Sequence, residues 1–197
     1  HNAGERKNRD VMCRGGRMTY GFGFWRSGYT GLIPWHWAWT MSPDPFDYLR
    51  SKYSGCGQRI DDDGEVIPAV YWECFREGYD DARYLFTLQQ AAWERSLSTD
   101  PQCRSLVQDA ERQLQAIWDA IEPQDRYLAD GLWPSSEFDA RRWQLAMLIE
   151  KLLKHPAQRS GIAPSVYAVT TEPRASAGRL TMDPTANSRN LEIFDLA

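Results

Sequence analysis

The sequence predicts an α/β fold that is mostly helical, and two observations lead to it. Residues 31–39, GLIPWHWAW, are short, apolar and bounded by turn residues, which is typical of a strand. Their apolar side chains fall on both faces, as in a parallel sheet that is covered on both sides. Because a single strand cannot form a sheet, we expect a series of alternating strands and helices that began upstream.

Helical spacing of apolar residues predicts a helix before that strand and another after it. The first covers residues 14–28 and ends at Gly28, and the second covers residues 68–97 and begins with Pro68. Residues 40–67 form a long connection between the strand and the second helix. The apolar positions of the second helix are Trp72, Phe75, Tyr79, Ala82, Phe86 and Trp93.

Two more helices are expected over residues 101–121 and 136–154. Asp100–Pro101 supplies an N-cap and a first helical residue to the earlier one, and Ser135 or Ser136 caps the later one. The apolar stripe of the earlier helix is Leu106, Leu114, Ile117, Trp118 and Ile121. That of the later helix is Phe138, Trp143, Leu145, Met147, Leu148 and Leu152.

The chain is therefore expected to have three parts. Residues 1–97 hold the strand and its helices, residues 98–155 form a helical extension, and residues 156–197 form a tail or linker. The tail is rich in Pro, Ser, Ala and Thr, so we expect it to be partly disordered. Within it, VYAVTT at 166–171 is a candidate for one isolated strand.

Charge, hydropathy and cysteine spacing argue against several kinds of partner and of site. A net charge of −4 without a clustered basic face argues against nucleic acid, and no run of apolar residues is long enough to span a membrane. Cys13, Cys56, Cys74 and Cys103 lack metal-ligand spacing, so no metal or cofactor is expected. We expect free thiols, and a single disulfide between Cys13 and Cys56 is the alternative in an exported protein.

Tryptophan is the unusual component of this chain. There are nine tryptophans, and four of them fall between Trp25 and Trp39. Indole faces stack on the C–H faces of sugar rings, although they also fill cores, and alternation places Trp35, Trp37 and Trp39 on one face of the strand. His36 faces the other way, where it either binds a sugar hydroxyl or packs against backbone.

Acidic clusters are candidates for two further kinds of site. Residues 61–65, DDDGE, lack the alternating ligands of a calcium loop and fit a solvated turn better. Glu73, Arg76 and Asp80 have the i,i+3 and i,i+4 spacing of ion pairs within one helix. We therefore expect salt bridges there rather than a pair of catalytic carboxylates.

Two stretches carry a resemblance to a known family. After Asn2, a series of residues recurs at the family's spacing: Arg17, Gly21, Trp25, Gly28, Gly31 and Trp35. The second stretch is WECFREGYDDARYL, Trp72 to Leu85. In their order within residues 1–90, these stretches resemble the last barrel units of the glycoside hydrolase family 123-like proteins, which include the domain of unknown function 4091.

That resemblance implies a (β/α)8 TIM-type barrel, of which this chain would be the C-terminal portion followed by extra helices. Residues 31–39 would be strand eight, and residues 68–97 would be helix eight. The active site of such a barrel lies at the C-terminal ends of its strands. The implied substrate-binding residues are Asn2, Trp35, His36, Trp37 and Trp39.

The resemblance also implies a carbohydrate substrate, of the N-acetylhexosaminide class. The compartment stays open, and a secreted or periplasmic full-length protein is one option. The family's adjacent Asp-Glu catalytic pair has no match here, and the pair Asp80–Asp81 lies in mid-helix. No catalytic residue is therefore assigned, and we expect the chain to be an inactive part of a glycoside hydrolase. The alternative is a non-catalytic carbohydrate-binding or helical interaction module, and the oligomeric state stays open.

Overall fold

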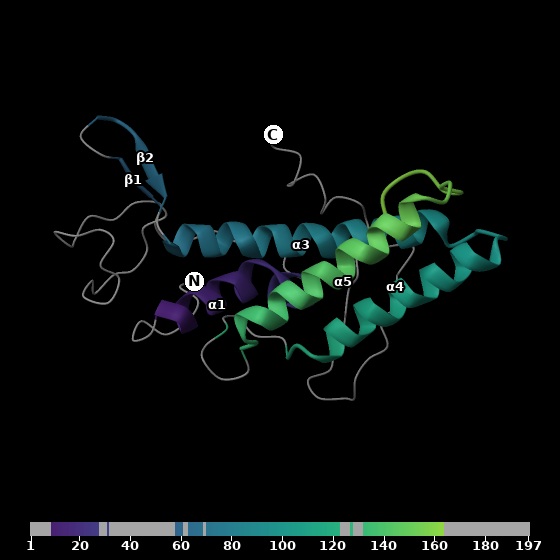
Figure 1. Cartoon of the computed structure of the whole chain (residues 1–197), viewed down its shortest axis with the longest axis horizontal. Coiled ribbons are helices and arrows are strands. Elements are labelled where there is room, and N and C mark those ends of the chain that lie inside the picture. The colour runs from purple at the N-terminus through teal and green to yellow at the C-terminus, as the bar shows by residue number, and fades with distance from the viewer. Residues whose placement is uncertain are drawn as a thin grey trace. The chain divides into compact units, whose positions relative to one another are not determined.

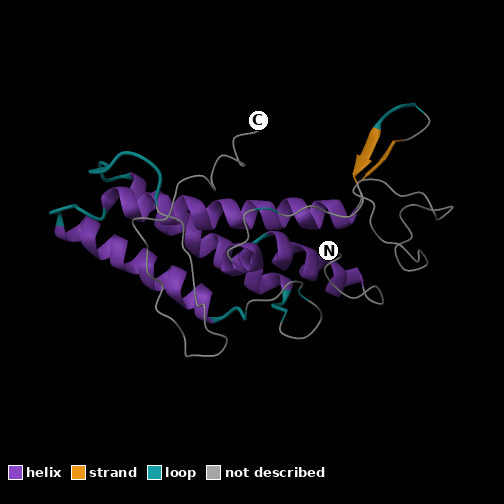
Figure 2. Ribbon diagram, turned by 180° about the vertical axis from the view of Figure 1, so that it is seen from behind, coloured by secondary structure: helices purple, strands orange, loops and turns teal. Residues whose placement is uncertain are grey.

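The computed structural model describes residues 9–27, 31, 58–60, 63–68, 70–122, 127 and 132–163. These residues are mostly helical (Figures 1 and 2). The helices are α1 (Arg9–Tyr20), α2 (Phe22–Ser27), α3 (Val70–Arg95), α4 (Pro101–Asp119) and α5 (Ser135–Leu153). The strands are β1 (Gln58–Ile60) and β2 (Val66–Pro68).

The predicted α/β barrel is wrong for the residues that the structure describes. β1 and β2 form an antiparallel two-stranded ribbon, with Arg59 opposite Ile67, whereas a barrel of this kind needs parallel strands joined by helices. The ribbon forms at the end of the predicted long connection, where Gly64, at φ 84°, lets the chain reverse. Pro68, the expected first residue of the next helix, is the last residue of β2, and α3 begins at Val70. Of the predicted strand at 31–39, only Gly31 lies within the described residues.

Three of the predicted helices are confirmed, each to within two residues at either end. α3, α4 and α5 correspond to the expected helices at 68–97, 101–121 and 136–154. Asp100 caps α4 as predicted, because its Oδ1 accepts a hydrogen bond from the Gln102 amide at 3.0 Å.

The single helix predicted at 14–28 is two helices in the structure. α1 begins earlier, at Arg9, and the chain breaks at Gly21 before α2 begins. There the Gly21 amide donates to the Met18 carbonyl at 3.3 Å, a bond that spans only three residues. Glycine is the weakest helix former after proline, which explains why the break falls at this position.

The described residues belong to two compact units. The first contains α1, the start of α2, the ribbon, α3 as far as Ala82, Tyr127 and residues 132–138. The second contains the end of α2 from Trp25, Gly31, the rest of α3, residues 96–122 with α4, α5 from Asp139, and residues 154–163. The predicted boundaries after residues 97 and 155 stay predictions.

Aromatic side chains fill the first unit. Phe22 is fully buried, and its ring lies 5.1 Å from that of Trp133 and 6.0 Å from that of Phe138. Tyr20 of α1 stacks on Phe75 of α3, with ring centroids 4.0 Å apart. Edge and stacked ring pairs of this kind contribute beyond the apolar area they bury. They join α1 to α3, and they join the start of α2 to Trp133 and to the first turn of α5.

Each helix of the second unit contributes one buried apolar stripe. At the C-terminal end of α4, Arg26 donates hydrogen bonds to the Trp118 and Ile121 carbonyls at 3.0 Å. The helix dipole also favours a cation at this end. The buried residues are Leu85, Leu88 and Ala92 of α3, Val107, Ala110, Leu114, Ile117 and Trp118 of α4, and Leu145, Ile149 and Leu152 of α5.

Residues 156–163, the start of the predicted tail, are hydrogen-bonded to α3. The amides of Gln158 and Arg159 donate to the Glu94 carbonyl at 2.8 and 3.1 Å. The Ala163 amide donates to Gln90 Oε1 at 2.6 Å, and Ala163 itself is buried. This part of the tail therefore belongs to the second unit. The candidate strand at 166–171 lies outside the described residues.

Candidate functional site

The sugar-binding residues implied by the family resemblance lie outside the described residues. They are Asn2, Trp35, His36, Trp37 and Trp39. The candidate site below is therefore built from the helical part of the chain.

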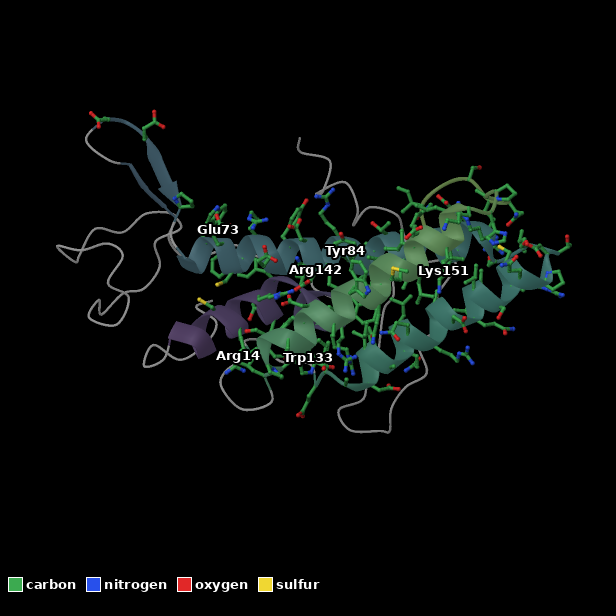
Figure 3. The ribbon with its side chains drawn as sticks, in the orientation of Figure 1. Arg14, Glu73, Tyr84, Trp133, Arg142 and Lys151 are labelled. Carbon is green, nitrogen blue, oxygen red and sulfur yellow. The ribbon has the colours of Figure 1, made fainter. Side chains whose placement is uncertain are left out.

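The carboxylates on the exposed face of α3 are neutralised by one arginine. Arg76 binds Glu73 at 2.7 Å, Glu77 at 2.8 Å and Asp80 at 3.3 Å. The hydrogen bond and charge of Glu73, with the charges of Glu77 and Asp80, raise the pKa of Arg76. The predicted intrahelical salt bridges are thus confirmed. Figure 3 labels Glu73, which projects from α3.

The first unit also buries an ion pair that the spacing within α3 did not indicate. The Asp81 side chain is 0% exposed and binds Arg17 of α1, with the Nε to Oδ2 distance 2.7 Å and the Nη2 to Oδ1 distance 3.2 Å. The Arg17 guanidinium also lies 4.9 Å from the centre of the Phe138 ring. Such a two-bond arrangement satisfies a buried carboxylate, so its role is structural.

A histidine–aspartate pair occurs in the second unit. His155 Nδ1 lies 3.0 Å from Asp100 Oδ2, and the His155 carbonyl accepts a hydrogen bond from Arg95 Nε at 2.9 Å. Such a pair orients a base in some hydrolases. Here the other oxygen of Asp100 caps α4, so both residues tie the segment after α5 to the bundle.

Over the described residues, no three metal-ligating side chains gather into a cluster. The acidic turn at 61–65 is described only from Asp63 onward, where Asp63, Gly64 and Glu65 are exposed. Within the same residues, no helix has both the length and the apolar character needed to cross a membrane.

An exposed aromatic side chain marks the most distinctive surface of the second unit. Trp143 of α5 is 67% exposed, although the sequence pattern placed it among the apolar positions of this helix. On the same side of α5, Ala140 is exposed and Met147 is partly exposed. We call Asp139, Ala140, Trp143, Met147, Glu150, Lys151 and Lys154 the α5 face.

Sequence reasoning missed this face for an identifiable reason. Phe138, Leu145 and Leu152 repeat every seven residues and are buried, whereas Trp143 lies two residues before Leu145 and so points to another side of the helix. Counting the angular position of each apolar residue would have separated Trp143 from the buried stripe. Figure 3 labels Lys151 on the same helix.

Charge along the α5 face follows a simple order. Asp139 lies near its start, and Lys151 and Lys154 lie near its end. Lys154 binds Glu150 at 2.9 Å, and this hydrogen bond is the main cause that lowers the pKa of Glu150. The face therefore has an acidic beginning, an apolar centre and a mainly basic end.

Comparisons of the chain with protein-family models, with curated proteins and with solved structures each found no match.

Proposed function

We propose that this chain is a non-catalytic helical interaction module that binds a second copy of itself through the α5 face. The observation that carries the proposal is the 67% exposure of Trp143. Tryptophan is strongly enriched among the residues that dominate binding energy at protein interfaces. An aromatic ring surrounded by small and flexible apolar side chains is suited to pack against another helix.

The order of charges favours a second copy in an antiparallel orientation. If Trp143 packs against Met147 of the second copy, the same register places Asp139 against Lys151 of the second copy. Twofold symmetry repeats both contacts, so one register pairs the apolar centres of the two helices and also pairs the acidic beginning of each with the basic end of the other. Antiparallel helices also oppose their macrodipoles, which adds a small favourable term.

The test is sedimentation equilibrium of the full chain over a wide concentration range. We expect a weak dimer, because one helix per copy buries little area. Trp143→Ala should raise the dissociation constant by about tenfold or more, which corresponds to the loss of a dominant interface side chain. Leu97→Ala is the matched control, since Leu97 is 58% exposed but lies outside α5.

A charge exchange tests the register. Asp139→Lys alone should weaken the dimer, because it places two lysines opposite each other, and adding Lys151→Asp should restore it. A chain that stays monomeric at all concentrations would contradict the proposal. Equal effects of the Trp143 and Leu97 variants would contradict the α5 face as its location.

The family resemblance supports a second candidate function, carbohydrate binding through Trp35, Trp37 and Trp39. If residues 31–39 form a strand, alternation places these three indoles on one face, which suits the faces of sugar rings. Hydrolysis of a glycosidic bond would then belong to a longer protein, because the family's Asp-Glu pair has no counterpart in this chain.

This second candidate is tested by titrating the chain with N-acetylglucosamine while following the indole N–H signals by NMR. We expect Trp37→Ala to weaken binding by about 1–3 kcal/mol, the value of one lost aromatic contact. Indole signals that do not move at saturating sugar would rule it out.

A further inference from the structure

Two cysteine side chains meet where α1 packs on α3. Cys13 and Cys74 share a side-chain hydrogen bond, and both are partly buried thiols that take part in no disulfide. Cys103, by contrast, is fully buried in α4. A small reagent can therefore reach the first two thiols more readily than the third.

The backbones of the two helices touch one turn beyond these cysteines. A Cβ atom added to Gly78 would lie 2.5 Å from the Arg17 carbonyl oxygen, and one added to Gly21 would lie 2.7 Å from the Gly78 carbonyl oxygen. Figure 1 shows α1 beside the first half of α3. Such close backbones leave no room for side chains at the crossing itself.

Both cysteines lie on the helix faces that make this crossing. Cys13 precedes Arg17 by four residues, and Cys74 precedes Gly78 by four, so each lies one turn before the contact and on the same side. A disulfide needs Cα atoms about 4.4–6.8 Å apart, a separation that only closely packed elements reach.

Two further contacts hold the helices in this register. Arg17 and Asp81 form the buried ion pair, and Tyr20 stacks on Phe75. The alignment of the two thiols therefore does not depend on the thiols themselves.

We infer that Cys13 and Cys74 are a redox-responsive thiol pair that forms a reversible disulfide by exchange with a small-molecule disulfide. The thiolate of one cysteine attacks one sulfur of the reagent, which forms a mixed disulfide and releases the first small thiol. The other cysteine then attacks the protein sulfur of that mixed disulfide and releases the second small thiol. Two protein thiols and one small disulfide thus become one protein disulfide and two small thiols.

The surroundings of Cys74 couple it to Cys13. Its hydrogen bond with Cys13 is the main cause that raises the Cys74 pKa, followed by burial and by the charge of ionised Cys13. The positive charge of Arg17 acts in the opposite direction. Because the two thiols influence each other directly, either one can make the first attack and the other then resolves the mixed disulfide.

The test equilibrates the full chain in mixtures of reduced and oxidised glutathione. Remaining thiols are alkylated, and the disulfide is located by peptide mapping. We expect one disulfide, between Cys13 and Cys74. The equilibrium constant for its formation by exchange with oxidised glutathione should be at least about tenfold greater than in concentrated urea, where the helices no longer align the thiols. The single variant Cys74→Ser should stop at a glutathione adduct on Cys13.

Other outcomes overturn the inference. A disulfide between Cys13 and Cys56 would show that another part of the chain aligns the Cys13 thiol. Glutathione adducts on both Cys13 and Cys74, or no reaction at either, would show that the two sulfurs do not reach bonding distance. The Cys103→Ala variant is the control and should still form the Cys13–Cys74 disulfide.

Discussion

At the scale of single residues, the Asp81 carboxylate of the first unit is a group whose burial costs much free energy. It is removed from water completely, and Arg17, which pairs with it, comes from a different helix. A buried charge is tolerated only when a partner and hydrogen bonds replace the lost water. The pair therefore constrains how α1 packs on α3.

Asp81→Asn is expected to lower the free energy of unfolding by about 3–5 kcal/mol, because it breaks the buried ion pair between Asp81 and Arg17 by removing one of the two charges. Glu73→Gln on the same helix is the matched control and should cost at most about 1 kcal/mol, since the Glu73–Arg76 pair is exposed. Urea unfolding measures both. Equal losses would show that the Arg17–Asp81 pair does not hold the helices together.

The Tyr20 hydroxyl provides a pH-dependent prediction. Burial raises its pKa from 10.0 to about 12. The folded protein therefore keeps this proton over a pH range in which the unfolded chain loses it. The contribution of the Tyr20 hydroxyl to the free energy of unfolding is thus fully present below pH 10 and is lost as the pH rises through about 12.

Tyr20→Phe should remove this part of the alkaline loss of stability, as followed by urea midpoints from below pH 10 to about pH 12. Tyr79, which is 39% exposed, offers Tyr79→Phe as a control that should keep the loss. If the Tyr20 variant loses stability as steeply as the parent chain, the Tyr20 hydroxyl is not the group whose ionisation causes the loss.

At the scale of elements, the contact of α1 with α3 depends on two glycines. Gly78→Ala would raise the intrinsic helix propensity of α3, but the added methyl group would meet the Arg17 backbone at 2.5 Å. We expect overpacking to win and to cost about 1–3 kcal/mol. Thr87→Ala, at an exposed position of α3, should be neutral or stabilising when both are measured by thermal unfolding.

The start of α4 depends on one aspartate with two roles. Asp100→Ala should lower stability by about 1 kcal/mol through the lost cap, and further through the lost contact with His155. Asp109→Ala removes an exposed carboxylate of the same helix that pairs with Arg112, so it should cost less. Chemical unfolding of the two variants compares them, and a reversed order would contradict the capping role.

At the scale of the whole molecule, residues 156–163 add a non-helical segment to the second unit. Besides the backbone bonds to Glu94, Gln90 donates to the Gly161 carbonyl at 2.8 Å, and the Arg159 guanidinium lies 5.4 Å from the Trp93 ring. These contacts cover the last turns of α3.

Two truncated chains test this segment. A chain that ends at residue 155 should be less stable than one that ends at residue 163 by about 1–3 kcal/mol, because the hydrogen bonds to Glu94 and Gln90, of about 1 kcal/mol net each, and the burial of Ala163 are lost. Both lack the same C-terminal residues, so their difference isolates the segment. Identical urea midpoints would show that it contributes nothing.

The sequence by itself determined α3, α4 and α5, since the signals for them are local. Apolar spacing, the Asp100 cap and Pro101 specify where a helix forms and ends whatever it packs against. The ion pairs of Arg76 were predictable for the same reason, because their partners lie within one turn. The barrel was wrong because it joined such local signals through a family pattern, and pairing between strands is not a local property.

Only the tertiary structure decided which helix faces meet. The partner of Asp81, the exposure of Trp143 and the meeting of Cys13 with Cys74 all depend on side chains from distant parts of the chain, or on which side of a helix is covered. Spacing along one helix carries no information about the helix that packs on it. That choice depends on close packing at positions such as Gly21 and Gly78, where the absence of a side chain lets two backbones touch.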